Sequence, residues 1–138
     1  MSTPRVDLRV GDVLLPPNRI PVVRPTTLLK ATLEAMARFK LGVASVVDDD
    51  GILKGIFTDG DIRRMLLRDQ KPFSALFVDD IIRHATVAPT VVGPDESLAK
   101  AIAVMEEKGI WDLPVVDGAG RLKGLLHLHQ ALKVTLGL

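Results

Sequence analysis

The chain has 138 residues, and its 18 basic and 17 acidic residues give a formal net charge of +1. Its hydrophobic fraction of 47% and charged fraction of 25% are typical of a globular protein and exclude a disordered chain. The balanced charge provides no basic surplus for nucleic-acid binding, and no apolar run reaches the length of a membrane-spanning helix. The absence of cysteine excludes disulfides, thiol catalysis and thiolate metal sites. Since residues 1–7 lack the apolar core of a signal peptide, we expect a cytoplasmic protein.

The sequence contains one motif twice. When it is shifted by 69 positions, Val22-Val23 falls on Val91-Val92, and Met36 falls on Met105. Further identical pairs include Pro25 with Pro94, Asp48 with Asp117, and Leu53-Lys54-Gly55 with Leu122-Lys123-Gly124. Chance matching of common aliphatic residues does not explain these coincidences, because proline, methionine, aspartate, lysine and glycine also match. An internal repeat fixes the architecture of a chain, so we interpret the two halves as copies of one structural unit.

The first repeat predicts six elements in chain order. Its long helix carries Leu29, Leu33 and Met36 on one face, with Thr26 or Thr27 as the N-cap. A continuous apolar run then leads into an Asp-rich turn and a returning strand. In order, the predicted elements are a short helix at 10–14, a strand at 20–23, the long helix around 29–36, strands at 43–47 and 53–57, and a closing helix at 59–67.

The second repeat predicts the same elements after a polar connector at 68–74. Its long helix carries Leu98, Ile102 and Met105 in the same spacing, with Asp95 or Ser97 as the N-cap. The predicted elements are a short helix at 79–84, a strand at 90–92, the long helix around 98–105, strands at 113–116 and 122–126, and a closing helix at 128–136.

Each unit therefore has the order β-α-β-β-α, which belongs to the α/β (α+β) class. The long helix connects two strands, and such a crossover favours parallel pairing. The predicted boundaries are 8–67 for the first repeat, 68–76 for the linker and 77–136 for the second repeat. Because one repeat of about 60 residues buries little core alone, we expect two repeats related by a pseudo-two-fold axis and packed sheet to sheet.

This repeated unit, with its second hairpin containing Leu113-Pro114-Val115-Val116-Asp117 and Leu122-Lys123-Gly124, resembles the cystathionine-β-synthase (CBS) domain. The resemblance covers about residues 8–133 and implies a tandem CBS pair. A narrower resemblance, to the CBS region of arabinose-5-phosphate isomerases, rests on residues 9–13, 20–22, 55–64 and 124–129. In that family a separate sugar-isomerase (SIS) domain, which the matched residues do not include, holds the catalytic site. CBS pairs joined to sugar nucleotidyltransferases also carry a run similar to 58–64.

The strongest chemical signal is Thr58-x-x-Asp61, which directly follows a strand. The CBS resemblance implies that this hydroxyl and this carboxylate contact phosphate and ribose, with Val43 and Ile56 as apolar walls and Thr90 as a further contact. A helix N-terminus, with its free N–H groups, suits a phosphate, and Arg63 or Arg64 would add positive charge. The same spacing is also that of a helix capping box, so ligand contact and simple capping both stay open here.

The second repeat departs from this pattern, because His127 and Gln130 stand where Thr58 and Asp61 stand in the first. We therefore expect ligand in the first repeat and not in the second, although His127 can contact an anionic ligand when it is protonated. If His127 and His129 were both in a strand, they would point to opposite sides and would share no metal. Trp111 is the only tryptophan; base stacking and packing are equally plausible roles for its indole.

The sequence thus predicts a regulatory module that binds a small ligand, either an adenine or cytidine nucleotide or a nucleotide-sugar. It contains no candidate catalytic residues and no metal site, and we expect no required cofactor. The implied partners are an attached or associated SIS isomerase domain and a second copy of the chain, with no nucleic acid and no membrane. The homodimer is expected because Ile62, Met65, Leu66, Leu132 and Leu136 make the closing helices unusually apolar. The alternatives are a structural oligomerisation module without ligand and the regulatory module of a sugar nucleotidyltransferase.

Overall fold

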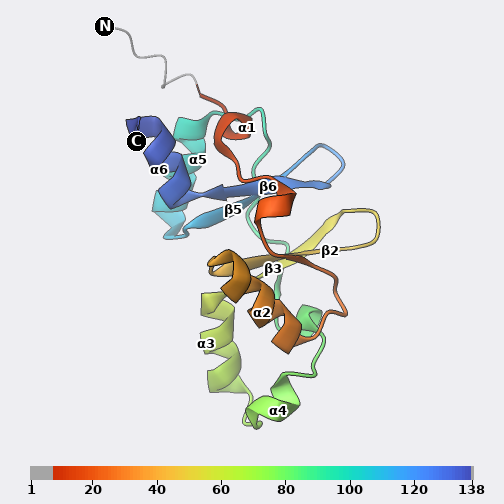
Figure 1. Cartoon of the computed structure of the whole chain (residues 1–138). Coiled ribbons are helices and arrows are strands. Elements are labelled where there is room, and N and C mark those ends of the chain that lie inside the picture. Colours follow the sequence, from red (N-terminus) through yellow and green to blue (C-terminus); the bar gives the residue numbers. More distant parts are fainter. Residues whose placement is uncertain (1–7, 138) are drawn as a thin grey trace, which may run out of the picture. The chain divides into compact units, whose positions relative to one another are not determined.

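The computed structural model describes residues 8–137, which form two compact units. The first-repeat unit is Asn18–Pro89. The second-repeat unit combines residues 8–17 with residues 90–137. Both contain helices and strands in a mixed α+β arrangement, as predicted (Figure 1). The compact units therefore do not coincide with the sequence repeats, because each unit also includes the residues that lead into the other repeat.

The first-repeat unit contains a four-stranded sheet with the order β1-β2-β3-β4. β1 pairs in parallel with β2, which confirms the crossover prediction, while β2–β3 and β3–β4 are antiparallel. Figure 1 shows α2 and α3 beside the β2–β3 hairpin. The elements are η2 (Pro17–Arg19), whose first residue belongs to the other unit, β1 (Val22–Val23), α2 (Leu29–Phe39), β2 (Val43–Val47), β3 (Leu53–Thr58), α3 (Asp59–Arg68), α4 (Phe73–Leu76), η3 (Ile81–Arg83) and β4 (Thr86–Val87).

The second-repeat unit contains an antiparallel hairpin of β5 and β6, with α5 and α6 beside it (Figure 1). The strand predicted at 90–92 is reduced to a single parallel bridge from Val92 to Val115. This bridge is parallel, like the pairing of β1 with β2 in the first unit, but it involves only one pair of residues. The elements are α1 (Val10–Val13), α5 (Leu98–Lys108), β5 (Asp112–Val116), β6 (Leu122–His127) and α6 (Leu128–Leu136).

Each unit has its own apolar core. In the first-repeat unit, Phe57, Leu29 and Leu76 are almost completely buried. In the second, Met105, Leu113 and Leu126 have the same role. The predicted apolar faces of the two long helices therefore point inward. Burial of one such side chain contributes about 1.5–3 kcal/mol, so these residues supply the main driving force for each unit.

The segments that cross between the repeats, residues 8–15 and 77–87, are called here the exchanged segments. They complete the N-terminus of the long helix of the unit in which they lie. The carbonyl groups of Asp79 and Phe77 accept hydrogen bonds from the N–H groups of Leu29 and Lys30, at 2.9 and 3.1 Å. In the other unit, the Leu8 carbonyl accepts from the N–H of Leu98 at 2.9 Å. Backbone carbonyls thus satisfy helix donors that a side-chain cap would otherwise serve.

This arrangement corrects the predicted N-cap of the first long helix. Neither Thr26 nor Thr27 caps it: the N-cap is Leu28, which makes no side-chain cap bond. The Thr27 hydroxyl instead accepts from the N–H of Arg24 at 2.9 Å. In the second helix Ser97 is the N-cap, and its hydroxyl accepts from Lys100 N–H, so that prediction is confirmed.

The repeated Leu-Lys-Gly motif marks the places where the exchanged segments approach the hairpins. A Cβ atom on Gly55 would lie 2.7 Å from the carbonyl oxygen of Thr86. A Cβ atom on Gly124 would lie within clashing distance of the carbonyl oxygen of Leu15. Only glycine permits backbone contact this close. The glycine of this motif therefore allows each exchanged segment to pack directly against a hairpin strand.

Candidate functional site

Thr58 and Asp61 lie at the junction between β3 and α3, as predicted. Thr58 is the N-cap of α3, and its hydroxyl accepts from the N–H of Asp61 at 3.2 Å. In return, the Asp61 carboxylate accepts from the Thr58 N–H at 2.9 Å. The two residues form a complete capping box. Capping is thus established for both side chains, while their contact with a ligand stays a prediction.

The Asp61 carboxylate is almost entirely buried, with 5% of its side chain exposed, and both of its oxygens are engaged. Oδ2 accepts from the Thr58 N–H and from the Thr58 hydroxyl at 3.1 Å. Oδ1 accepts from the Arg64 guanidinium at 2.6 Å and from the Thr86 hydroxyl at 2.8 Å. A carboxylate offers about four acceptor positions. A ligand can therefore reach Asp61 only by displacing a donor of the protein itself.

Two residues around Asp61 differ in how well the sequence reveals them. Arg64 was one of two candidate cations, and the structure selects it because its guanidinium pairs with Asp61. Thr86 was not predicted, since it belongs to the lead-in to the second repeat. β4 places Thr86 opposite Ile56 in the first sheet, next to the end of β3. To predict Thr86, one would have to know that the segment leading into the second repeat packs on the first, and the repeat pattern does not contain that information.

The predicted apolar walls also lie beside Thr58. Val43 is the residue paired with Thr58 across β2 and β3, and it is buried. Ile56 is half-buried and lies two residues before Thr58 on β3. Four of the predicted residues, Thr58, Asp61, Val43 and Ile56, are therefore brought together in the first-repeat unit.

The other three predicted residues, Thr90, Trp111 and His127, belong to the second-repeat unit. Thr90 is half-buried there. Trp111 is 67% exposed, so its indole is not part of the core of that unit. Its backbone carbonyl accepts from the N–H of Leu128 at 2.8 Å, which fixes the start of α6.

His127 is paired with Asp112, an acid that was not predicted to matter. The Nδ1 atom of His127 lies 2.7 Å from Oδ1 of Asp112, and the two residues are directly opposite each other on β5 and β6. The corresponding pair in the first repeat is Val43 and Thr58. Aligning the two repeats would have placed an acid opposite the histidine. The second repeat has therefore replaced an apolar–hydroxyl pair by a His–Asp pair.

The strand alternation considered for His127 and His129 does not apply, because β6 ends at His127 and His129 lies in α6. Their ring centroids are 6.4 Å apart. Within residues 8–137 no cluster of three or more His, Cys, Asp or Glu side chains forms a candidate metal site. None of the helices described is long and apolar enough to cross a membrane.

A shallow pocket of about 380 Å³ opens on the helical side of the first-repeat unit. Its lining includes Leu33 and Met36 from α2 and Ile62 from α3, with Lys40 and Asp59 among the polar residues. The pocket is mainly an apolar groove between two helices, and it does not include Thr58 or Asp61.

The sequence profile of the CBS domain matches residues 10–68 and 78–137, which is most of the chain. The chain belongs to the CBS domain family. It is a tandem CBS pair, as the sequence resemblance implied, and the β-α-β-β-α repeat, the hairpins and the closing helices are those of that family.

Two relatives are arabinose 5-phosphate isomerases named KdsD. The protein from Pseudomonas aeruginosa is 36% identical over 129 residues, which cover 94% of this chain and 38% of that protein. The protein from Yersinia pestis is 34% identical over 127 residues, which cover 91% of this chain and 37% of that protein. The chain thus spans less than two fifths of the length of these relatives.

Solved structures share the fold over nearly the whole chain. A crystal structure of CBSX2 in complex with AMP is 29% identical, has a TM-score of 0.82 and covers 94% of this chain and 97% of that chain. A second structure, the CBS-pair protein CBSX2 from Arabidopsis thaliana, is 28% identical, has a TM-score of 0.81 and covers 94% of this chain and 95% of that chain.

Proposed function

We propose that this CBS pair is a regulatory module that binds an adenine nucleotide at Thr58 and Asp61. The observation that carries the proposal is the buried Asp61 carboxylate beside the Thr58 hydroxyl at the start of α3. A carboxylate can accept two hydrogen bonds from the vicinal hydroxyl groups of a ribose. The N-terminus of α3 and the Arg64 guanidinium supply positive potential for a phosphate. The AMP complex of the related CBSX2 supports the choice of ligand.

The first repeat is the binding repeat in this proposal. In the second repeat, Gln130 stands in the position of Asp61 and brings no charge. Hydrogen bonds to a charged acceptor are roughly twice as strong as neutral ones. The His127–Asp112 pair also directs one imidazole nitrogen toward a protein carboxylate and away from a ligand. A ribose is therefore held more strongly in the first repeat.

Calorimetric titration with AMP, CMP and a cytidine nucleotide-sugar tests this proposal. Asp61→Asn preserves the size of the side chain and removes its charge, so it should weaken nucleotide binding about tenfold. Gln130→Ala, at the equivalent position of the second repeat, is the matched control and should change affinity much less. Equal losses in the two variants, or no binding of any nucleotide to the unmodified protein, would leave Asp61 as a helix cap only.

The enzyme that we propose it regulates is a cytoplasmic arabinose-5-phosphate isomerase. The support is the identity of 34–36% to the KdsD proteins over a part of their length. Sequencing the complete reading frame tests whether a sugar-isomerase domain accompanies the pair. Where it does, isomerase activity should respond to AMP, and the response should disappear in Asp61→Asn but persist in Gln130→Ala. An isomerase that is indifferent to nucleotide would contradict the regulatory proposal.

We further propose that the chain forms a homodimer through its helices. Leu66 and Leu67 on α3 are 44% and 79% exposed, and Leu132 and Leu136 on α6 are also exposed. Met65, which the sequence argument included, is buried inside its own unit and supplies no surface. The groove between α2 and α3 offers an apolar seat for the corresponding helices of a second copy. Light scattering at micromolar concentration should give the mass of a dimer, and Leu67→Lys should shift it toward a monomer. A monomeric mass for the unmodified protein would contradict the proposal.

A further inference from the structure

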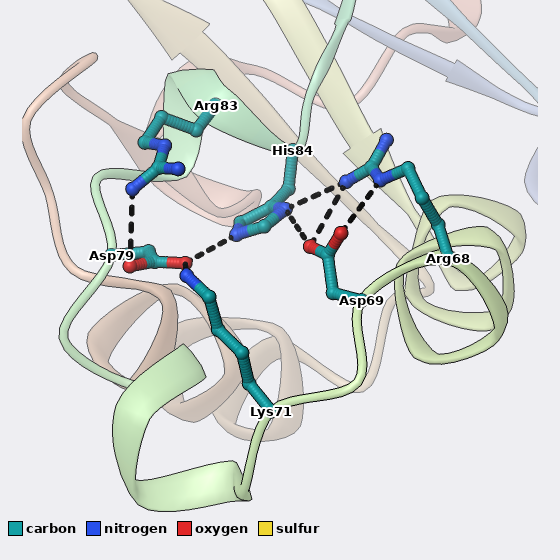
Figure 2. A network of polar contacts seen from close by, with 6 residues as sticks. All are labelled: Arg68, Asp69, Lys71, Asp79, Arg83 and His84. Carbon is teal, nitrogen blue, oxygen red and sulfur yellow. Dashed lines mark hydrogen bonds and ion pairs between the residues drawn. The ribbon is translucent and has the colours of Figure 1, made fainter.

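The first-repeat unit contains a polar network around a buried histidine, far in sequence from Thr58 (Figure 2). The His84 side chain is only 2% exposed. The charged groups placed around it are Arg68 at the end of α3, Asp69 and Lys71 in the connector, Asp79 before η3, and Arg83 within η3. An imidazole is the side chain most able to change its charge near neutral pH, so its surroundings determine what a change in pH does here.

The donors and acceptors define the tautomer of His84. Nε2 lies 2.9 Å from a carboxylate oxygen of Asp79. The hydrogen bond from His84 is the main cause that lowers the pKa of Asp79, so this carboxylate is ionised and only accepts. Nε2 therefore carries the proton. On the other side of the ring, a nitrogen of Arg68 lies 3.1 Å from Nδ1. A guanidinium only donates, so Nδ1 is an acceptor and the imidazole is neutral in this arrangement.

A second partner for Nδ1 is already in place. The Asp69 carboxylate lies 3.7 Å from Nδ1, just beyond hydrogen-bond distance. It is paired with Arg68, and the hydrogen bond from that guanidinium is the main cause that lowers the pKa of Asp69. When Nδ1 gains a proton, it can no longer accept from Arg68 and is repelled by the guanidinium. The new N–H can instead donate to Asp69, which needs to move by less than an ångström.

We propose that His84 is a pH-responsive switch, in which protonation exchanges Arg68 for Asp69 as the partner of Nδ1. Asp79 holds Nε2 in both states, and Lys71 and Arg83 keep Asp79 in place at 3.7 and 3.4 Å. Two discrete hydrogen-bonding arrangements around one ring are what a switch requires. The switch is independent of any ligand and goes beyond the nucleotide-binding proposal.

The position of His84 connects the switch to the rest of the unit. It lies in the exchanged segment 77–87, which holds the start of α2 through Phe77 and Asp79. Two residues after His84, the Thr86 hydroxyl donates to Asp61 at the start of α3. The switch acts on Arg68 at the end of the same helix. Its transition therefore changes the side-chain contacts of a segment that lies against both ends of α3, and the amide signal of Thr86 should report the change.

Nitrogen-15 NMR of the imidazole rings from about pH 8 to about pH 5 tests the switch. His84→Gln, His127→Gln and His129→Gln assign the three rings. At the upper end, His84 should be the Nε2–H tautomer with Arg68 as its second partner. At the lower end, both ring nitrogens should carry protons and the Arg68 contact should be lost. The amide signal of Thr86 should change over the same pH range in the unmodified protein. In His84→Gln the same signal should not change with pH.

Two variants should move the transition in opposite directions. Asp69→Asn removes the charged acceptor and should shift the transition to lower pH, while Arg68→Met removes the competing cation and should shift it to higher pH. The exposed His129 in α6 is the internal control, and its ring signals should be the same in all proteins at each pH. An Nδ1–H tautomer at pH 8, or one unchanged midpoint in both variants, would overturn the proposal and leave a static ion network.

Discussion

The substitution Thr86→Val tests directly whether Asp61 is a ligand-binding carboxylate or a helix cap. In the present structure the Thr86 hydroxyl donates to Oδ1 of Asp61, next to the Arg64 guanidinium. A ribose diol needs the same oxygen. Valine has the shape of threonine and suits the strand position in β4, but it has no donor. The variant therefore removes one internal competitor and leaves the capping box of Thr58 and Asp61 intact.

The size of the effect follows from the strength of this bond. A hydrogen bond to a charged group contributes about 1.5–3 kcal/mol, and the lower end applies because Thr86 is exposed and Arg64 stays in place. The ligand-free protein should thus lose about 1.5 kcal/mol of its free energy of unfolding. The nucleotide complex should lose little, because a ribose hydroxyl takes the place of the threonine hydroxyl. Since about 1.4 kcal/mol is a factor of ten in affinity, AMP should bind up to tenfold more tightly.

Calorimetric titration with AMP and urea unfolding of the same preparations would measure the two quantities together. Thr135→Val in α6 is a suitable control, because it also removes a half-buried hydrogen bond. There the Thr135 hydroxyl donates to the carbonyl of Ala131, in the other unit. It should lower stability without raising affinity. If Thr86→Val bound AMP more weakly than the unmodified protein, Thr86 would be part of the bound site and the competition argument would be wrong.

Three further predictions concern stability. Lys40 ends α2 with a φ of 56°, and the equivalent residue of the second repeat is Gly109, with a φ of 65°. Because glycine adopts this left-handed conformation without strain, Lys40→Gly should raise the free energy of unfolding, measured by urea unfolding, by about 0.5–1 kcal/mol. Gly109→Ala should lower it. Gly55→Ala should cost about 1–3 kcal/mol, because its Cβ would meet the Thr86 carbonyl; an unchanged midpoint would mean that β4 is not held there. The backbone N–H groups of Ile52 and Arg121 lower the pKa values of Asp48 and Asp117. A lowered folded pKa stabilises the protein above the unfolded value, so this contribution should be lost as pH falls below about 4; thermal melts of Asp48→Asn/Asp117→Asn should show a flatter acid limb, and an unchanged slope would contradict this role.

The local elements were predictable because their signals lie within a few residues. The closing helix 128–136, the turn glycines and the β2–β3 hairpin follow from apolar runs, a turn and a helical stripe, and the structure confirms them. Gly51 and Gly120 have φ values of 82° and 86°, as those turns require. Thr58 and Asp61 were likewise visible as a spacing. That spacing alone could not separate capping from ligand binding, since both use the same two side chains.

Several of the parts that escaped prediction involve the exchanged segments. The absence of a threonine cap on α2, the hydroxyl of Thr86 on Asp61 and the pairing of β4 with β3 come from residues that the sequence repeat assigns to the other half. A repeat analysis compares position with equivalent position, so it detects what the halves share. It cannot show that residues leading into one half pack on the other, because both halves would have the same pattern in either case.

The repeated glycine is the one sequence feature that carries this information. Gly55 and Gly124 are equivalent positions, and at each of them a side chain would collide with the backbone of an exchanged segment. Glycine is unfavourable in a strand interior; the φ of 157° at Gly124 favours it within its own hairpin, whereas Gly55 has no positive φ. A glycine in the same strand of both repeats therefore indicates that another backbone packs there. In the first unit that backbone carries Thr86, so the same close contact that builds the sheet also determines what occupies Asp61 before a ligand arrives.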